Sequence, residues 1–236
     1  MTRPRLLDLF CGAGGAARGY QRAGFYVVGV DIKPQPRYAG DEFIQADAMM
    51  FPLDGYDVIH ASPPCQAYSV TKHSWHHTQR RMNEKHPELI PPTRTRLRAN
   101  GVPYVLENVI GAPLEAPVLL CGTMFGLATP DIDGTPLFLR RHRIFESSEF
   151  LAAPTFCICA DLKARGFRVG GVYGGGSENR DKAARRAGGY TPGKQQRAEL
   201  IDADWMTLAE LSQSIPPAYT EHIGRALLSA LKANVA

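Results

Sequence analysis

Cys65 lies in a segment whose residue types could support covalent chemistry. The segment runs Ser62-Pro63-Pro64-Cys65-Gln66-Ala67-Tyr68-Ser69, directly after a strand-like stretch over residues 57–61. Two prolines fix the backbone before the thiol, and a thiolate held at a strand end is a competent nucleophile when its pKa is lowered. A lone cysteine is more often a small buried apolar residue. The stiff loop and the basic stretch that follows it favour the nucleophile.

Two further segments carry groups that suit a heterocyclic substrate. Glu107 follows strand-like residues 104–106, where a carboxyl can hydrogen-bond or protonate a ring nitrogen. A helix cap is the alternative interpretation. Arg141 and Arg143 are two residues apart, so that on a strand both guanidinium groups point to the same side. Such a pair suits a base oxygen or a phosphate, whereas an exposed basic edge strand is the alternative.

A glycine-rich turn near the N-terminus predicts a nucleoside site. The pattern Phe10-x-Gly12-x-Gly14 follows an apolar stretch and fits neither the dinucleotide fingerprint nor a triphosphate loop. It therefore favours a nucleoside without a pyrophosphate. Asp31 and Asp47 end the next two strand-like stretches, where the first could accept ribose hydroxyls and the second an adenine amino group. A tight turn and two helix-capping acids are the alternative.

Strand-like and helix-like stretches alternate through the first 125 residues. This rhythm predicts an α/β fold with a doubly wound, mostly parallel sheet. Near the C-terminus, an apolar residue recurs every fourth position, as on one face of a helix: Tyr219, Ile223, Leu227 and Leu231. Between the alternating first part of the chain and this C-terminal stripe, the sequence has glycine pairs, many charges and weak periodicity. This segment predicts a small loop-rich lobe. We expect a main domain over residues 1–146 plus 204–236 and the lobe over 147–203.

The net charge of +4 is unevenly distributed along the chain. Residues 72–98 hold seven Lys and Arg against two acids, and residues 161–200 hold nine against four. Two basic zones on an otherwise acidic chain indicate a polyanionic partner. Two solvated loops are the alternative interpretation.

The composition narrows the class of protein. Hydrophobic residues make up 44% of the chain and charged residues 21%, which suits a packed core and disfavours a disordered chain. No apolar stretch reaches the roughly 20 residues that span a bilayer, and we expect no secretory signal. Five cysteines, an odd number, favour reduced thiols in a cytoplasmic protein. We expect a monomer without a membrane partner.

A metal site is not expected from the sequence. Cys157 and Cys159 are close neighbours in a segment of the expected lobe. However, a zinc ion takes four ligands, and only Cys121 and scattered histidines remain to complete a set. We therefore predict that the protein holds no metal.

Taken in order, these segments resemble the motifs of DNA (cytosine-5-)-methyltransferases. The resemblance rests on four segments: Asp8-Leu9-Phe10-Cys11-Gly12-Ala13-Gly14-Gly15, Pro64-Cys65-Gln66, Glu107-Asn108-Val109 and Arg141-His142-Arg143. It covers residues 5–146 and, more weakly, 204–236. The family implies a Rossmann-like catalytic domain that binds S-adenosylmethionine and a small lobe that reads the target in duplex DNA.

The resemblance also implies a role for each matching residue. Cys65 would add to cytosine carbon 6, Glu107 would contact ring nitrogen 3, and Arg143, with Arg141 in the same set, would contact the base carbonyl. The cofactor would be held by Phe10, Gly12, Gly14, Asp31, Ile32, Asp47 and Pro64. The DNA, with its target base flipped out, would be contacted by Gln66, Ser69, Arg80, Arg81 and Arg96.

The chain departs from the family pattern at several positions. Asp31 stands where Glu is usual, Ser62 where Gly is usual and Leu139 where Gln is usual. The expected lobe is short, which keeps methylation of RNA or of a free pyrimidine nucleotide as an alternative. A non-catalytic DNA-binding relative is a further alternative, which the intact Cys65 and Glu107 disfavour. An orphan methylase and one paired with a restriction nuclease are both compatible with the sequence.

Overall fold

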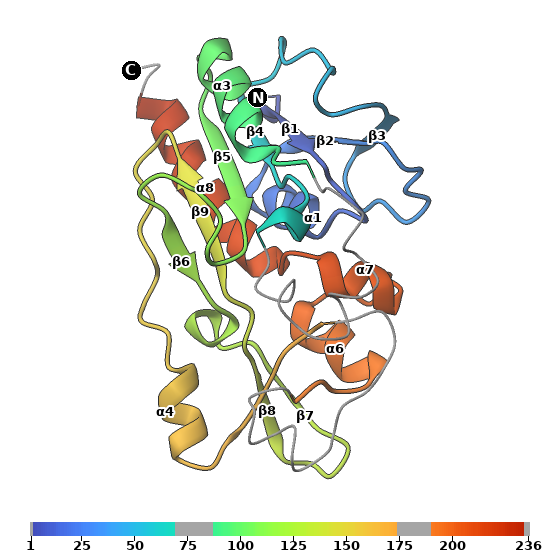
Figure 1. Cartoon of the computed structure of the whole chain (residues 1–236), viewed down its shortest axis with the longest axis vertical. Helices are drawn as coiled ribbons and strands as arrows, with labels where there is room; N and C mark the ends of the chain where they lie inside the picture. Colours follow the sequence, from blue (N-terminus) through green and yellow to red (C-terminus); the bar gives the residue numbers. More distant parts are fainter. Residues whose placement is uncertain (1, 69–86, 174–189, 234–236) are drawn as a thin grey trace.

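A computed structural model of the chain describes residues 2–68, 87–173 and 190–233. Within these residues the larger sheet has seven strands: β1 (Arg5–Leu9), β2 (Tyr26–Asp31), β3 (Glu42–Gln45), β4 (Val58–Ala61), β5 (Tyr104–Asn108), β6 (Val118–Leu120) and β9 (Arg143–Ser147). They are hydrogen-bonded in the order β3-β2-β1-β4-β5-β9-β6 (Figure 1).

The larger sheet is doubly wound, as the sequence predicts. Strands β3, β2, β1, β4 and β5 are parallel to one another. The chain begins in the middle at β1, adds β2 and β3 on one side, and then crosses to β4 and β5 on the other. Of the seven strands, β9 alone runs in the opposite direction, because it is antiparallel to both β5 and β6. The prediction of an α/β fold with a mostly parallel sheet is confirmed.

Helices cover both faces of the larger sheet. On one face α1 (Gly15–Ala23) packs against α8 (Pro217–Ala233), and on the other lies α3 (Ile90–Asn100). The apolar stripe predicted near the C-terminus lies on α8 and faces the core. A Cβ at Gly19 would lie 2.1 Å from the Pro217 carbonyl oxygen, so glycine allows this close approach of the two helices. Of the helices in the described residues, none is long and apolar enough to cross a membrane.

A second sheet lies in the lower half of the view in Figure 1. Its strands, in the order β10-β8-β7, are β7 (Ala128–Pro130), β8 (Pro136–Leu139) and β10 (Arg168–Gly170). The helices of this part are α4 (Cys159–Ala164), α6 (Lys194–Ile201) and α7 (Leu208–Gln213). Because β7 and β8 precede residue 147 and α7 follows residue 203, this part takes in more of the chain than the lobe expected from the sequence. The predicted domain boundaries stay a prediction.

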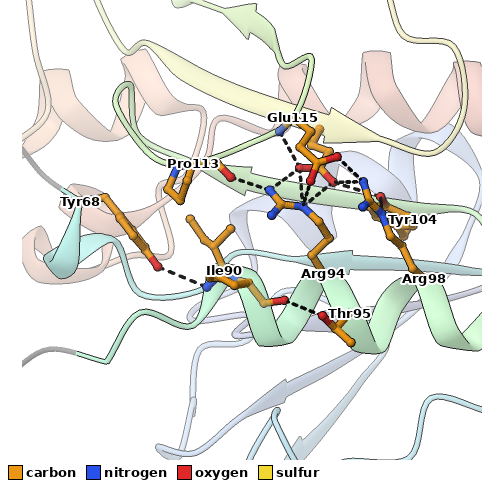
Figure 2. A network of polar contacts seen from close by, with 10 residues as sticks. Tyr68, Ile90, Arg94, Thr95, Arg98, Tyr104, Pro113 and Glu115 are labelled. Atoms are coloured by element: carbon orange, nitrogen blue, oxygen red, sulfur yellow. Dashed lines mark hydrogen bonds and ion pairs between the residues drawn. The ribbon is translucent and has the colours of Figure 1, made fainter.

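A buried carboxylate fastens α3 to the sheet. Arg94, Arg98 and Tyr104, all three labelled in Figure 2, form hydrogen bonds with Glu146 of β9. Glu146 is 3% exposed and accepts hydrogen bonds from Arg94 (2.7 Å), the Tyr104 hydroxyl (3.0 Å) and the Glu115 N–H (2.8 Å). Burial opposes its ionisation, but these bonds keep the pKa of Glu146 below its usual value. The network therefore ties α3, β5 and β9 together.

Candidate active site

The loops after β1 and β4 start side by side. Leu9 and Ala61 are partners in the register of these neighbouring strands, and the Ser62 N–H donates to the Leu9 carbonyl oxygen at 3.1 Å. From here the chain leaves β1 toward β2 and leaves β4 toward β5, in opposite directions across the sheet. Doubly wound sheets bind ligands at such a switch point. The glycine-rich turn and the Cys65 segment both begin there.

The pleat of the sheet brings three polar side chains to the face that α1 covers. Asp8 on β1 pairs in register with His60 on β4. His60 in turn pairs with Val105 on β5, and Glu107 lies two residues further along that strand. Because alternate residues of a strand share a face, Asp8, His60 and Glu107 lie on the same side. All three are buried.

Cys65 begins a short 3₁₀ turn, η1 (Cys65–Ala67), and is half-buried. Asn108 fixes the approach to this turn, because its Nδ2 donates to the Pro63 carbonyl oxygen at 2.9 Å. Burial raises the pKa of the Cys65 thiol, while the Arg143 guanidinium lowers this pKa and the Glu107 carboxylate raises it. The thiol is therefore protonated at neutral pH in the resting protein, and it shares its surroundings with Glu107 and Arg143.

Glu107 and Arg143 form a buried ion pair. The Arg143 Nε lies 3.1 Å from the Glu107 Oε1, and the two side chains are 11% and 7% exposed. Burial raises the pKa of Glu107, against the opposing effects of Arg143 and of a hydrogen bond with Ser62. A carboxyl with a raised pKa keeps its proton to higher pH and can donate it.

A chain of hydrogen bonds leads from α1 to Glu107. The Tyr20 hydroxyl lies 2.9 Å from Nδ1 of His60, and Nε2 of His60 lies 2.8 Å from the Ser62 hydroxyl, which bonds to Glu107. Burial lowers the pKa of His60 to about 3, so that its ring is neutral. Ser62 stands where the family usually has Gly, which could not make this contact.

The glycine-rich turn has the backbone that its sequence predicts. The φ angles of Gly12 and Gly14 are 50° and 82°, and Phe10 also adopts the left-handed region with φ 60°. This conformation is costly for a residue other than glycine and persists only when the surrounding structure requires it. The Gly12 N–H donates to Asp31 Oδ2 at 3.1 Å. The predicted turn and the acid that ends β2 are therefore in direct contact.

The remaining residues predicted to hold the cofactor lie along the same edge of the sheet. Ile32, next to Asp31, is 65% exposed, and Pro64 is exposed beside the thiol. Asp47, two residues beyond β3, is exposed and accepts the Met49 N–H at 2.8 Å. These residues follow the carboxyl ends of β2, β4 and β3, the edge at which such sheets bind ligands.

Asp8 is a candidate site residue that the sequence analysis missed. Both of its carboxylate oxygens are buried, and within the described residues neither has a hydrogen-bond partner. Burial, with Asp31 and Glu107 nearby, raises the pKa of Asp8 well above its usual value. A buried carboxyl of this kind fits a ligand that brings a hydrogen-bond donor or a positive charge, and S-adenosylmethionine carries both. The available signal was an acid within the apolar strand Leu6-Leu7-Asp8-Leu9.

Arg141 does not lie where the sequence predicts. Its guanidinium is fully buried and donates to three carbonyl oxygens, those of Ser214 (2.7 Å), Val172 (2.6 Å) and Ser212 (2.8 Å). Burial lowers the pKa of Arg141 to about 9, and the nearby charge of Arg143 adds to this. The prediction that both arginines share one side of a strand is wrong because β9 begins only at Arg143. Arg141 therefore links the part of the fold that contains the second sheet with the segment that precedes α8.

The predicted DNA contacts fall into three groups. Gln66 is exposed on η1. Arg96, on α3, donates to the carbonyl oxygens of Ala48 (2.8 Å) and Phe51 (2.6 Å), so its guanidinium holds the loop after β3. Its predicted contact with a phosphate stays a prediction, because these two bonds leave other N–H groups of the guanidinium available. The others, Ser69, Arg80 and Arg81, lie outside the described residues.

Two of the basic residues in the segment 147–203 also serve the fold. Arg168 forms ion pairs with Asp131 at 2.7 Å and with Asp133 at 2.8 Å. Arg197 is fully buried and donates to the Pro192 carbonyl oxygen at 2.6 Å. The charge that this segment offers to a polyanion is therefore smaller than its composition indicates.

The fold also gathers four side chains that the sequence analysis treated as separate. The ligand atoms of Cys121, His142, Cys157 and Cys159 all lie within 4.8 Å of one another. The expectation of no metal rested on a shortage of ligands near Cys157 and Cys159. The fold removes this shortage, because it brings Cys121, just after β6, and His142, just before β9, to these two cysteines.

Solved structures of methyltransferases are similar to this chain. The S. pombe Dnmt2 methyltransferase matches it with a TM-score of 0.60 at 13% identity, over 97% of this chain and 99% of that one. An E. coli prophage protein described as a DNA modification methyltransferase matches with a TM-score of 0.59 at 15% identity, also over 97% and 99%. The Entamoeba histolytica methyltransferase EhMeth matches with a TM-score of 0.56 at 12% identity, over 98% and 99%.

Sequence comparison adds no relative to this set. None of the family models matches the chain. Among curated proteins there is likewise no match. At 12–15% identity, likeness to solved structures speaks for the fold, and the chemistry must be argued from the residues. The chain has the Rossmann-like fold of these methyltransferases, as its resemblance to the DNA (cytosine-5-)-methyltransferases implied.

Proposed function

We propose that the protein transfers a methyl group from S-adenosylmethionine to carbon 5 of cytosine in duplex DNA. The observation that carries the proposal is the buried Glu107–Arg143 ion pair in the surroundings of Cys65. A thiol, a carboxyl with a raised pKa and a guanidinium are the groups that activation of a cytosine ring requires. They lie at the edge of the sheet where the glycine-rich turn and Asp31 would form a nucleoside site.

The cofactor site would be formed by the turn over residues 10–14 and the acids that follow neighbouring strands. Each carboxylate oxygen of Asp31 accepts one backbone N–H, from Gly12 and Lys33. Because such an oxygen can accept two hydrogen bonds, Asp31 retains capacity for ribose hydroxyls. Asp8 would meet the positively charged part of the ligand. When bound, S-adenosylmethionine supplies a methyl group that its sulfonium activates.

Cys65 would make carbon 5 of cytosine nucleophilic. The thiol would first lose its proton to water, and the thiolate then forms a bond from Sγ to carbon 6, which pushes an electron pair toward carbon 5 and ring nitrogen 3. The methyl group that the bound cofactor would supply would pass to carbon 5, with a neutral thioether as the leaving group, and the carbon 5 proton would then pass to water. The carbon–sulfur bond breaks, which restores the ring and releases Cys65 for the next turnover.

Glu107 and Arg143 would stabilise the ring during this addition. Because burial raises the pKa of Glu107, the carboxylate of the ion pair can take up a proton when the base binds and donate it to ring nitrogen 3 as negative charge develops there. Arg143 contacts Glu107 through Nε and the His142 carbonyl oxygen through Nη1. A guanidinium has five N–H groups, and we assign one of the others to the base carbonyl oxygen.

We assign duplex DNA as the substrate in preference to RNA or a free nucleotide. The excess of Lys and Arg over acids in residues 72–98 and 161–200, although Arg168 and Arg197 use part of it, favours a long polyanion over a free nucleotide. The structural match to a protein described as a DNA modification methyltransferase points the same way. The target carbon is buried in a duplex, so the base would have to be flipped into the site.

Methyl transfer from labelled S-adenosylmethionine to duplex DNA, RNA and deoxycytidine monophosphate, side by side, tests the proposal. We expect the label in 5-methylcytosine of duplex DNA, with at least about 100-fold less in the other two. Cys65→Ser should lower transfer by at least about 1,000-fold, because a hydroxyl is a far weaker nucleophile. Calorimetry should show unchanged cofactor binding in this variant. Label found only in RNA, or only in the nucleotide, would refute duplex DNA as the substrate.

The pH dependence of Cys65 alkylation reports its raised pKa. The thiolate reacts, and its fraction grows with pH, so alkylation by iodoacetamide should still accelerate above pH 9, the usual pKa of the thiol. Arg143→Gln should move the curve to higher pH, because it removes a cation that stabilises the thiolate. Peptide mass spectrometry follows Cys65, with N-acetylcysteine amide as the reference. A plateau at lower pH than the reference would contradict the assignment.

Substitutions of Arg141 and Arg143 should have different effects, the first mainly on the free energy of unfolding and the second mainly on the methylation rate. Arg143→Gln should lower the methylation rate by about 100-fold or more. It also removes the partner of the buried Glu107, but Gln can still donate a hydrogen bond and Glu107 can take up a proton, so the loss of stability should be smaller than for Arg141→Ala. Arg141→Ala leaves three buried carbonyl oxygens without partners and should lower the free energy of unfolding by about 3 kcal/mol or more. Urea denaturation and single-turnover rates separate the two effects. A stable but inactive Arg141 variant would restore its place among the catalytic residues.

A further inference from the structure

Cys121, His142, Cys157 and Cys159 form a compact group, here called the cysteine cluster, outside the candidate active site. It contains three sulfurs and one imidazole nitrogen within 4.8 Å of one another. We propose that the cysteine cluster binds one zinc ion as a structural site. The inference rests on the described residues alone and is independent of the proposed methylation.

The distances fit a single tetrahedral ion. Zinc lies about 2.3 Å from sulfur and about 2.0–2.1 Å from nitrogen, which places tetrahedral ligand atoms roughly 3.5–3.8 Å apart. In the cysteine cluster, the Cys121 and Cys159 sulfurs are 3.2 Å apart, as are Nε2 of His142 and the Cys157 sulfur. Since no pair exceeds 4.8 Å, shifts of less than about 1 Å bring all four atoms onto one ion.

The donor set selects zinc and a closed site. Three thiolates and an imidazole are a common ligand set for structural zinc, whereas calcium and magnesium require oxygen ligands. Four protein ligands complete the tetrahedron and leave no position for a substrate, as in structural sites. A disulfide is the competing use of two thiols, but its bond of about 2.05 Å is far shorter than the 3.2 Å between Cys121 and Cys159.

Thr123 supplies further support around the ligands. Its hydroxyl lies 3.7 Å from the Cys121 and Cys157 sulfurs and 3.6 Å from that of Cys159. The Ile158 N–H donates to the same hydroxyl at 3.4 Å, which links it to the backbone between two of the ligands. Hydrogen bonds of this kind orient metal ligands and stabilise thiolates.

The position of the cysteine cluster in the fold indicates which elements a bound zinc ion would hold together. Leu120 of β6 pairs with Arg143 of β9, so Cys121 and His142 are the next residues along the same pair of strands. Cys159 begins α4, with Cys157 just before it. An ion bound here would fasten the start of α4 to the edge of the larger sheet. It would also fix His142, the residue between the two arginines with structural and catalytic roles.

The ion would have a route of entry. Cys121 and Cys159 are buried, but His142 and Cys157 are half-buried and border a cavity of about 490 Å³. A metal site needs such an access path in addition to its ligands.

Metal analysis of the protein, produced without a metal-binding tag and kept reduced, tests the proposal. Elemental mass spectrometry should find about one zinc ion per chain. Cys157→Ser, at a half-exposed position, should lose most of the zinc. Cys65→Ser, the matched control outside the cysteine cluster, should keep it. Cobalt added to zinc-depleted wild type should give the visible bands of a tetrahedral thiolate site, and these bands should be missing in Cys157→Ser.

Stability gives a readout that does not depend on the variants. Removal of zinc from wild type by a strong chelator should lower the melting temperature by about 5 °C or more, and added zinc should restore it. The proposal would be overturned by a wild-type protein that takes up neither zinc nor cobalt. A zinc content unchanged by Cys157→Ser would also overturn it. So would a Cys121–Cys159 disulfide in peptide maps of the freshly purified protein.

Discussion

Glu107 and Arg143 form an ion pair with almost no contact with solvent, and the arrangement of the candidate site depends on it. Removing two charges from water is costly, so such a pair persists only when its geometry is good and further hydrogen bonds satisfy the charged groups. Ser62 and the His142 carbonyl oxygen supply these bonds. Because Glu107 is on β5 and Arg143 on the antiparallel strand β9, the pair requires β9 to lie directly beside β5.

Three sets of contacts hold β9 in this position. Glu146, further along the strand, binds Arg94 of α3 and the Tyr104 hydroxyl of β5. Just before the strand, Arg141 binds three backbone carbonyl oxygens. Between these two anchors lies His142, which belongs to the cysteine cluster. The polar groups near Arg143 therefore fix one guanidinium beside Glu107, the arrangement on which the proposed activation of a base next to Cys65 depends.

The sequence predicted the elements whose signals are local. Short apolar stretches separated by helical ones indicated the doubly wound sheet, and the residues expected to hold a nucleoside do follow its strands. The buried position of Arg141 was not predictable from the sequence. Its hydrogen-bond partners are the carbonyl oxygens of Val172, Ser212 and Ser214, which are far away in the chain. The sequence analysis considered these cysteines but predicted no metal, because the contacts that bring the cysteine cluster together are also far apart in the chain. Cys121 and His142 come together only when β6 pairs with β9, and a single residue separates Cys157 from Cys159, less than the usual spacing of zinc ligands.

The most direct test of the account is a trapped complex with duplex DNA in which 5-fluorocytosine replaces cytosine throughout. Fluorine at carbon 5 cannot leave as a proton, so the bond between enzyme and base should persist after methyl transfer. In the presence of S-adenosylmethionine, the account predicts an adduct that survives denaturation and maps by peptide mass spectrometry to Cys65. No adduct, or an adduct on another residue, would contradict the role of Cys65 and the site built around it.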